Sequence, residues 1–159
     1  MKKIIGSIIL LCFLNSCNDD TFYQLQIIIK NETTSELNVK VFPKSEYRLG
    51  VLYDFGIGGG YRETEFHINP TDEFELFSTE DLKIEPNTLT AQVFDSIHVN
   101  STDGNIKIKF SLSTVTGYPD NLYNDPANWS YEIRHFALPT QFKRNPVESH
   151  DYIFTITNQ

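Results

Sequence analysis

Aromatic and polar side chains gather in residues 117–129, in an irregular stretch that contains two prolines. Flat rings bind the C–H faces of sugars, while amides and carboxylates exchange hydrogen bonds with hydroxyl groups, and ligand sites combine such walls and polar groups. We therefore predict a ligand-binding loop that uses Tyr118, Asp120, Tyr123 and Trp129. The alternative is structural: Trp129 and one tyrosine fill the core, while the prolines and Asx residues build turns.

The same loop contains oxygen ligands for calcium in Asp120, Asn124 and Asp125. Their spacing is not that of an EF-hand, so turn formation is the plainer interpretation. The glycine-rich residues 56–60 lack the Lys-Ser/Thr pair that contacts phosphates, and we interpret them as a link between two strands. The sequence therefore predicts no cofactor.

Glu63, Glu65 and His67 alternate along one predicted strand, so their side chains share a face on which a metal ion would find three ligands. An exposed strand face is polar for the simpler reason that it contacts water. The remaining histidines form no recognisable nucleophile motif with a serine or cysteine. We expect neither a metal site nor catalytic residues.

The elements that would position these side chains are strands, because apolar and polar residues alternate with a period of two through most of the chain. We predict an all-β fold, an antiparallel β-sandwich of eight or nine strands, immunoglobulin-like or of a related Greek-key type. Residues 27–41 should form one hairpin, Asp103-Gly104 should turn another, and residues 78–81 are a candidate helical turn. The runs expected to be extended are residues 25–30, 37–41, 47–55, 61–68, 74–76, 89–99, 106–112, 129–133 and 152–157.

The charge of the chain bounds its partners. The 159 residues include 13 Lys and Arg and 21 Asp and Glu, which gives a formal charge of −8 at pH 7. A net negative charge favours solubility and counts against binding nucleic acid or anionic headgroups through protein charge. We therefore expect no nucleic-acid partner.

The first residues have the three zones of an export signal: Lys2 and Lys3, an apolar run over residues 4–14, and small residues before Cys17. Leu14-Asn15-Ser16-Cys17 resembles the lipobox of a bacterial lipoprotein. The resemblance implies cleavage before Cys17 and a lipid on its thiol, with stable anchoring from at least two acyl chains. It divides the chain into a signal peptide (1–16), a lipidated tether (17–23) and one β-sandwich domain (24–159).

Two further short resemblances point to one bacterial group. The acidic residues Asp19 and Asp20, just after Cys17, resemble the surface-export signal of Bacteroidota lipoproteins. Asp95-Ser96-Ile97 resembles the sequon at which Bacteroidota O-glycosylate exported proteins, so Ser96 is a candidate glycosylation site. The implied location is the outer membrane, at the cell surface or else facing the periplasm.

These features lead to one functional expectation and two alternatives. We expect a non-enzymatic binding or structural lipoprotein of the outer membrane, anchored at Cys17, whose loops bind a glycan, a peptide or a protein partner. The first alternative is a lipid-anchored hydrolase of glycans or peptides, which would require two facing carboxylates or a Ser-His pair. The second is an immunity or inhibitor lipoprotein that blocks a basic toxin through its acidic surface.

Overall fold

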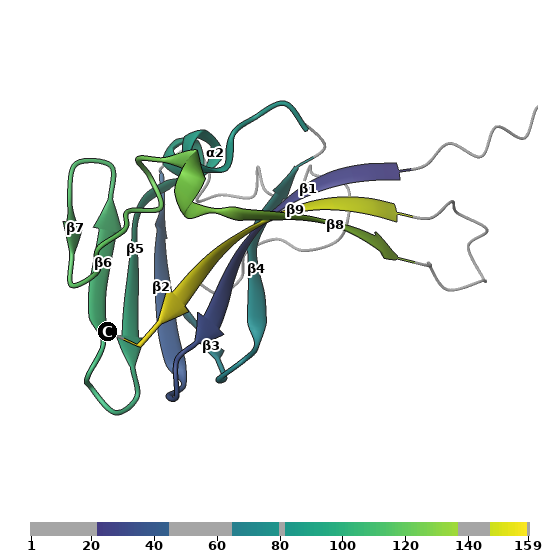
Figure 1. The fold of residues 1–159 in the computed structure, drawn as a ribbon. Coiled ribbons are helices and arrows are strands. Elements are labelled where there is room, and N and C mark those ends of the chain that lie inside the picture. Colours follow the sequence, from purple (N-terminus) through teal and green to yellow (C-terminus); the bar gives the residue numbers. More distant parts are fainter. Residues whose placement is uncertain (1–21, 45–64, 80–81, 137–146, 159) are drawn as a thin grey trace, which may run out of the picture.

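The computed structural model describes residues 22–44, 65–79, 82–136 and 147–158. The candidate lipidation site Cys17, the glycine-rich residues 56–60 and the expected strand at 47–55 lie outside these ranges. No helix in the described ranges has the length and apolar character needed to cross a membrane. The elements, labelled in Figure 1, are β1 (Phe22–Glu32), β2 (Leu37–Pro43), β3 (Glu65–Ile68), β4 (Glu73–Thr79), α2 (Pro86–Val93), β5 (Phe94–Ser101), β6 (Lys107–Ser111), β7 (Val115–Thr116), the 3-10 helix η3 (Pro126–Asn128), β8 (Ser130–Phe136) and β9 (Val147–Thr157).

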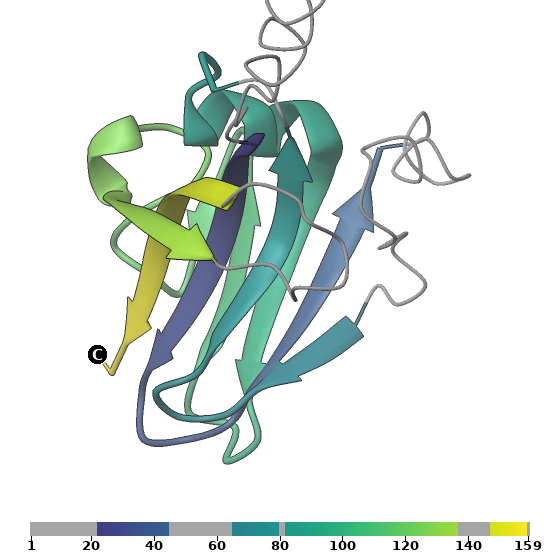
Figure 2. The same cartoon turned by 90° about the vertical axis from the view of Figure 1, so that its right-hand side faces the viewer.

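The prediction of an all-β sandwich of eight or nine strands is confirmed, and the described residues contain nine strands. The described strands form a four-stranded sheet A, in the order β4-β1-β9-β8, and a five-stranded sheet B, in the order β3-β2-β5-β6-β7. The two sheets lie against each other, and α2 lies at one end beside β5 (Figures 1 and 2). All neighbouring strands are antiparallel except β1 and β9, which run parallel over their whole length. The pairing of the first and last described strands therefore joins the two ends of the fold.

The alternation read from the sequence produces the core. On β1 and β2, every second side chain points between the sheets, as Leu25, Ile27, Leu37 and Val39 do, and all four are fully buried. These side chains belong to one apolar cluster that draws on both sheets and on α2. Burial of one such side chain contributes about 1.5–3 kcal/mol, so the facing apolar rows hold the sheets together.

The expected hairpin over residues 27–41 is wrong, because β1 and β2 belong to different sheets. The buried Asn31 forms the crossing: its Nδ2 donates to the carbonyls of Ser35 and Ile68, both at 2.9 Å. Its Oδ1 accepts from the amide of Thr33 at 2.9 Å and from the hydroxyl of Thr33 at 2.7 Å. These bonds satisfy the backbone where the chain leaves one sheet for the other, which a tight hairpin turn would not require.

The extended stretch expected from Leu89 is also wrong at its start, since residues 86–93 form α2 and only Phe94 begins the strand. Pro86 occupies the first turn, where its missing N–H and fixed φ suit a helix. Leu89 and Val93, four residues apart, are buried on one side of the helix. The apolar spacing in this segment has a helical period as well as an alternating one. Ser78 and Thr79 likewise belong to β4 and not to a helical turn, while residues 80–81 lie outside the described ranges.

Other local predictions are confirmed. Asp103 and Gly104 turn the hairpin between β5 and β6, with Gly104 at a φ of 77°, a conformation that glycine adopts without strain. The hydroxyl of Ser101 donates to Asp103, and the backbone amide of Ile106 donates to the Ser101 hydroxyl at 2.9 Å. This polar turn fixes the register of β5 and β6 in sheet B.

Candidate functional site

The predicted aromatic loop lies mostly in the core. Trp129 and Tyr123 are 7% and 3% exposed, and both belong to the buried apolar cluster. The indole Nε1 of Trp129 donates to the carbonyl of Leu122 at 3.2 Å, and its ring packs edge-on against Phe154, with centroids 5.4 Å apart. Burial, with a smaller effect of Asp95, raises the pKa of Tyr123 above its usual value. These two rings fill the core, in agreement with the structural alternative given for this loop.

Tyr118 and Asp120 are the accessible members of the predicted site. The half-buried Tyr118 donates its hydroxyl to the carbonyl of Thr155 at 3.1 Å and accepts from the amide of Thr157 at the same distance. Asp120 is exposed. The two buried rings are therefore not part of a surface site. A ligand that binds at Tyr118 and Asp120 stays a prediction.

Candidate ligands for calcium or another metal ion instead form contacts with neighbouring groups of the chain. Asp125 accepts from the amide of Ala127 at 2.8 Å and so begins η3. Glu65 accepts from the Asn38 amide at 2.8 Å, and the imidazole Nδ1 of His67 lies 2.8 Å from a carboxylate oxygen of Glu36. Glu63 lies outside the described residues, among which no three His, Cys, Asp or Glu side chains gather in a group suited to a metal ion.

Ser96, the candidate glycosylation site, is half-buried on the outer face of β5. Its Oγ lies 3.4 Å from Nε2 of His98, which is longer than the hydrogen bond of about 2.6–3.2 Å between the serine and histidine of a hydrolase. The His98 ring lies tilted against Phe42, with centroids 4.5 Å apart and 47° between the ring planes, and no carboxylate of the described residues hydrogen-bonds to it. The pair therefore lacks the third group that orients the imidazole in a serine hydrolase.

A larger group of exposed rings lies elsewhere, where β1, β9 and β8 extend past sheet B (Figure 1). Of the four large apolar side chains that are strongly exposed in the described residues, Tyr23, Tyr131 and Ile133 belong to these strands, at 46–49% exposure, and Leu112 does not. Their side chains point to the same side of sheet A as the core, because they pair in register with core-facing positions of β9. We call this surface the aromatic face and define it by Tyr23, Tyr131, Ile133, His135, Glu148, His150 and Tyr152.

Three side chains of the aromatic face form a hydrogen-bonded chain. Nε2 of His150 lies 3.0 Å from Oε1 of Glu148, and Nδ1 of His150 lies 2.5 Å from the hydroxyl of Tyr131. A carboxylate only accepts, so Nε2 carries the proton, and Nδ1 of a neutral ring accepts from Tyr131. The Tyr131 oxygen, when it donates to His150, can still accept a hydrogen bond from a ligand. His135 extends the group, with Nδ1 3.9 Å from Glu148.

The rings of the aromatic face are continuous. Tyr131 lies 5.1 Å from Tyr152 and 5.9 Å from His150 between ring centroids, and Tyr23 lies 6.3 Å from His150. Burial, followed by Tyr152 and Glu148, raises the pKa of Tyr131, so its phenol stays protonated at neutral pH. A protonated phenol is a poor nucleophile. Its hydroxyl does form hydrogen bonds at the edge of an otherwise apolar ring. The chemistry this surface supports is binding by stacking and hydrogen bonds.

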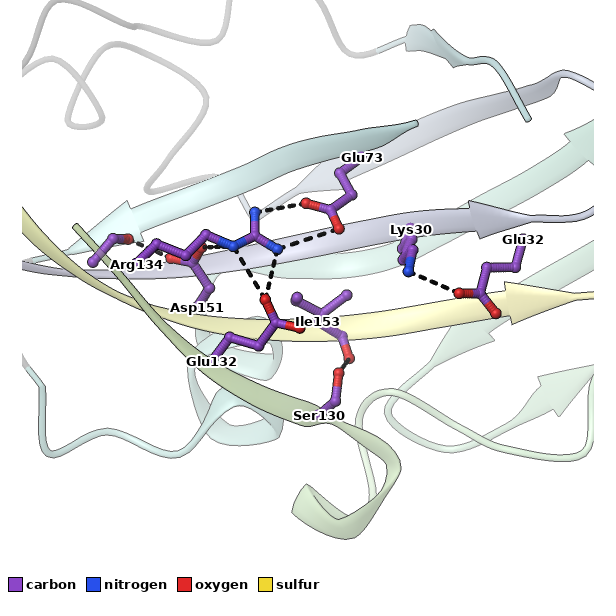
Figure 3. Close-up of polar contacts among 9 residues, drawn as sticks. Lys30, Glu32, Glu73, Ser130, Glu132, Arg134, Asp151 and Ile153 are labelled. Carbon is purple, nitrogen blue, oxygen red and sulfur yellow. Dashed lines mark hydrogen bonds and ion pairs between the residues drawn. The ribbon is translucent and has the colours of Figure 1, made fainter. Parts of the chain in front are cut away.

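The opposite side of the same strands holds a charged network (Figure 3). Arg134 on β8 donates from Nη1 to Oε2 of Glu73 on β4 at 2.7 Å and from Nη2 to Oε2 of Glu132 at 3.0 Å. Its Nε lies 3.2 Å from Oδ2 of the fully buried Asp151, an oxygen that accepts no hydrogen bond from the described residues. Burial raises the pKa of Asp151, against the hydroxyl of Ser149 and the charge of Arg134, which lower it. The network fixes β8, the strand that carries Tyr131 and Ile133.

The aromatic face does not follow from the sequence alone. Tyr131 and Ile133 were recognised as alternating residues of a strand, but their partners on β1 and β9 are more than a hundred and about twenty residues away. The sequence signal for this surface is the presence of Tyr131 and Ile133 on a strand that also carries charged residues. Comparison of the sequence with protein-family models and with curated proteins gives no match.

Proposed function

We propose that this chain is a non-enzymatic binding lipoprotein of the bacterial outer membrane, anchored through a lipid on Cys17, and that its aromatic face binds a glycan. The lipobox-like Leu14-Asn15-Ser16-Cys17 supports the anchor. The observation that carries the binding role is the exposure of Tyr23, Tyr131 and Ile133 together at one end of the fold. Exposed apolar patches on a soluble surface mark sites of interaction.

A glycan suits this face better than a purely apolar ligand. The rings offer flat surfaces, while the Tyr131 oxygen, Glu148 and the exposed His135 offer hydrogen bonds at their edges. Because His150 is held between Glu148 and Tyr131, the tyrosine hydroxyl is oriented before a ligand arrives. Orientation of this kind lowers the entropic cost of binding.

The hydrolase alternative has less support. Ser96 and His98 are close, but their pair sits on a sheet face without an orienting carboxylate among the described residues. The inhibitor alternative is favoured by the acidic outer face of sheet A, although Arg134 already pairs with three of the carboxylates there. Neither alternative uses the aromatic face.

The binding role is tested with the full chain in non-ionic detergent against an array of dextran, cello-oligosaccharides and chito-oligosaccharides. One stacked ring contributes about 0.5–1.5 kcal/mol, so Tyr131→Ala should weaken binding of the captured glycan by about threefold to tenfold. The matched control is Leu112→Ala, which removes an apolar side chain of 62% exposure away from the aromatic face and should leave the affinity unchanged. Equal affinities for the parent and Tyr131→Ala would contradict the proposal.

The anchor is tested separately by mass spectrometry of the protein isolated from membranes. The expected mature chain begins at Cys17 and carries acyl mass on that residue. A chain with an unmodified Cys17 would contradict the anchor. The binding role of the aromatic face would then be decided by the array measurement alone.

A further inference from the structure

Lysines and a histidine form a row across the outer face of sheet B. Lys40 on β2 pairs with His98 on β5, and His98 pairs with Lys109 on β6. Residues directly opposite each other on neighbouring strands point to the same face, so these three side chains lie side by side. Strands are about 4.8 Å apart, so the row spans about 10 Å. Lys107 lies in the next row, opposite Asn100.

Carboxylates are scarce on this face. Glu65 pairs with Lys40 at the β3 edge, with Nζ and Oε2 3.7 Å apart. Among the described residues, no carboxylate lies within ion-pair distance of Lys107 or Lys109. The outer face of sheet A is the reverse, with two cations and five carboxylates: Lys30, Arg134, Glu32, Glu73, Glu75, Glu132 and Asp151. A chain with a formal charge of −8 thus presents one basic sheet face.

One cation of this row, Lys109, has no oppositely charged neighbour among the described residues. Opposite charges directly across from each other stabilise a sheet, and Lys40 has such a partner in Glu65. The chain has 21 acidic residues, yet none of them lies opposite His98 or Lys109 in this row. The residue opposite Lys109 on β7 is Thr116. Burial, followed by the charges of Lys109 and Lys40, lowers the pKa of His98, in accord with a positive local potential. The charge of Lys109 is therefore not compensated by an ion pair in the described part of the chain and is available to an anionic ligand.

The surroundings of the row suit a polymer rich in hydroxyl groups. Ser96 and Ser111 lie opposite each other in the row on one side, and Asn38 and Asn100 in the row on the other. The Phe42 ring lies against His98 and below the Lys40 ammonium, which is 5.9 Å from its centroid. Hydroxyls and amides bind sugar hydroxyls, and the Phe42 ring adds apolar surface beside Lys40.

We propose that the outer face of sheet B, a basic face defined by Lys40, His98, Lys107 and Lys109, binds an acidic glycan, that is, a polysaccharide that carries carboxylate or sulfate groups. The lysines neutralise its charges, and the serine and asparagine rows on either side bind its hydroxyls. This surface and the aromatic face lie on different sheets. The two sites are therefore separable by mutation and by salt.

The test uses the full chain in non-ionic detergent, with polygalacturonate and heparin as acidic probes and dextran as the neutral one. The chain should bind both acidic probes, and binding should weaken as salt rises because the contact is electrostatic. Lys40→Gln and Lys109→Gln should each weaken binding about twofold to fivefold and flatten the salt dependence. The matched control is Lys30→Gln, which makes the same charge change on sheet A and should bind as the parent does.

Several outcomes would overturn the basic face. One is an equal loss in Lys30→Gln, which would assign the effect to net charge. Another is failure of the parent to bind either acidic probe, and a third is preference for vesicles of phosphatidylglycerol over both glycans. Tyr131→Ala should leave acidic-glycan binding intact, and loss of that binding would place the ligand on the aromatic face instead. If the aromatic face bound no glycan, the salt-dependent binding of acidic glycans to the basic face would still be expected.

Discussion

Arg134 and Glu73 join the two edge strands of sheet A, with Nη1 of the arginine 2.7 Å from Oε2 of the glutamate. Arg134 belongs to β8 and Glu73 to β4, with β1 and β9 between them. The same guanidinium lies 3.2 Å from Asp151, which is fully buried on β9 (Figure 3). One side chain thus links three of the four strands and neutralises a buried carboxylate.

Removal of Arg134 should be costly because it leaves Asp151 buried without its cation. Breaking a buried pair from one side costs about 3–5 kcal/mol, and the part-exposed Glu73 contacts add little. We therefore expect Arg134→Met to lower the free energy of unfolding by about 3 kcal/mol. In the double variant with Asp151→Asn, the loss should be smaller than in Arg134→Met alone. Urea unfolding of the four chains checks this, and additive losses would contradict the coupling.

The cost of Arg134→Met should depend on pH. Burial already raises the pKa of Asp151 above its unfolded value, and loss of the arginine raises it further. Ionisation of such a group opposes folding, so the penalty is largest at neutral pH, shrinks as the pH falls through the folded pKa, and disappears below the unfolded pKa. Thermal unfolding of both chains from neutral to acid pH should show their midpoints converging. A constant difference would assign the loss to packing.

Asn31 should be essential to the crossing between sheets. Asn31→Ala leaves the carbonyls of Ser35 and Ile68 and the amide of Thr33 without these partners in a buried site. Each unsatisfied buried group costs about 1–3 kcal/mol, so we expect a loss of roughly 3 kcal/mol or more in urea unfolding. Asn100→Ala, at an exposed position of β5, is the control and should change stability by less than about 0.5 kcal/mol.

His98 should make the fold less stable in mild acid. Burial and then Lys109 and Lys40 lower its folded pKa, so the unfolded chain takes up a proton at a higher pH than the folded chain does. Stability should therefore fall as pH falls from neutrality through the folded pKa, and remain low below it. His98→Gln should remove this slope, and Lys109→Gln should reduce it, in unfolding measured across that range. An unchanged slope in His98→Gln would contradict the assignment.

The strands and the core could be predicted from the sequence because both follow from alternation along one strand at a time. Partner choice could not: β1 pairs with β9 instead of β2, and nothing local to residues 27–41 distinguishes a hairpin from a crossing between sheets. The four-residue spacing of Leu89 and Val93 fits a helix, and Pro86 favours a helix that begins there.

The surfaces were harder to predict than the core for the same reason. Tyr131 becomes part of the aromatic face only when β8 pairs with β9, and Lys40 and Lys109 lie in one row only because β2 and β6 both pair with β5. The formal charge of −8 concealed the separation of basic and acidic side chains onto different sheets. Trp129 carried the strongest aromatic signal, yet a ring of its size is as useful inside the core as on a surface, and the structure places it inside.

The position of a bound glycan tests the central claim most directly. Hydroxyl-radical footprinting of the full chain, with and without the glycan captured from the array, reports which side chains lose reactivity on binding. We predict protection of Tyr23, Tyr131 and Ile133, with Leu112 unchanged. Protection of Tyr118 in the loop, with Tyr131 as reactive as in the free chain, would contradict the account.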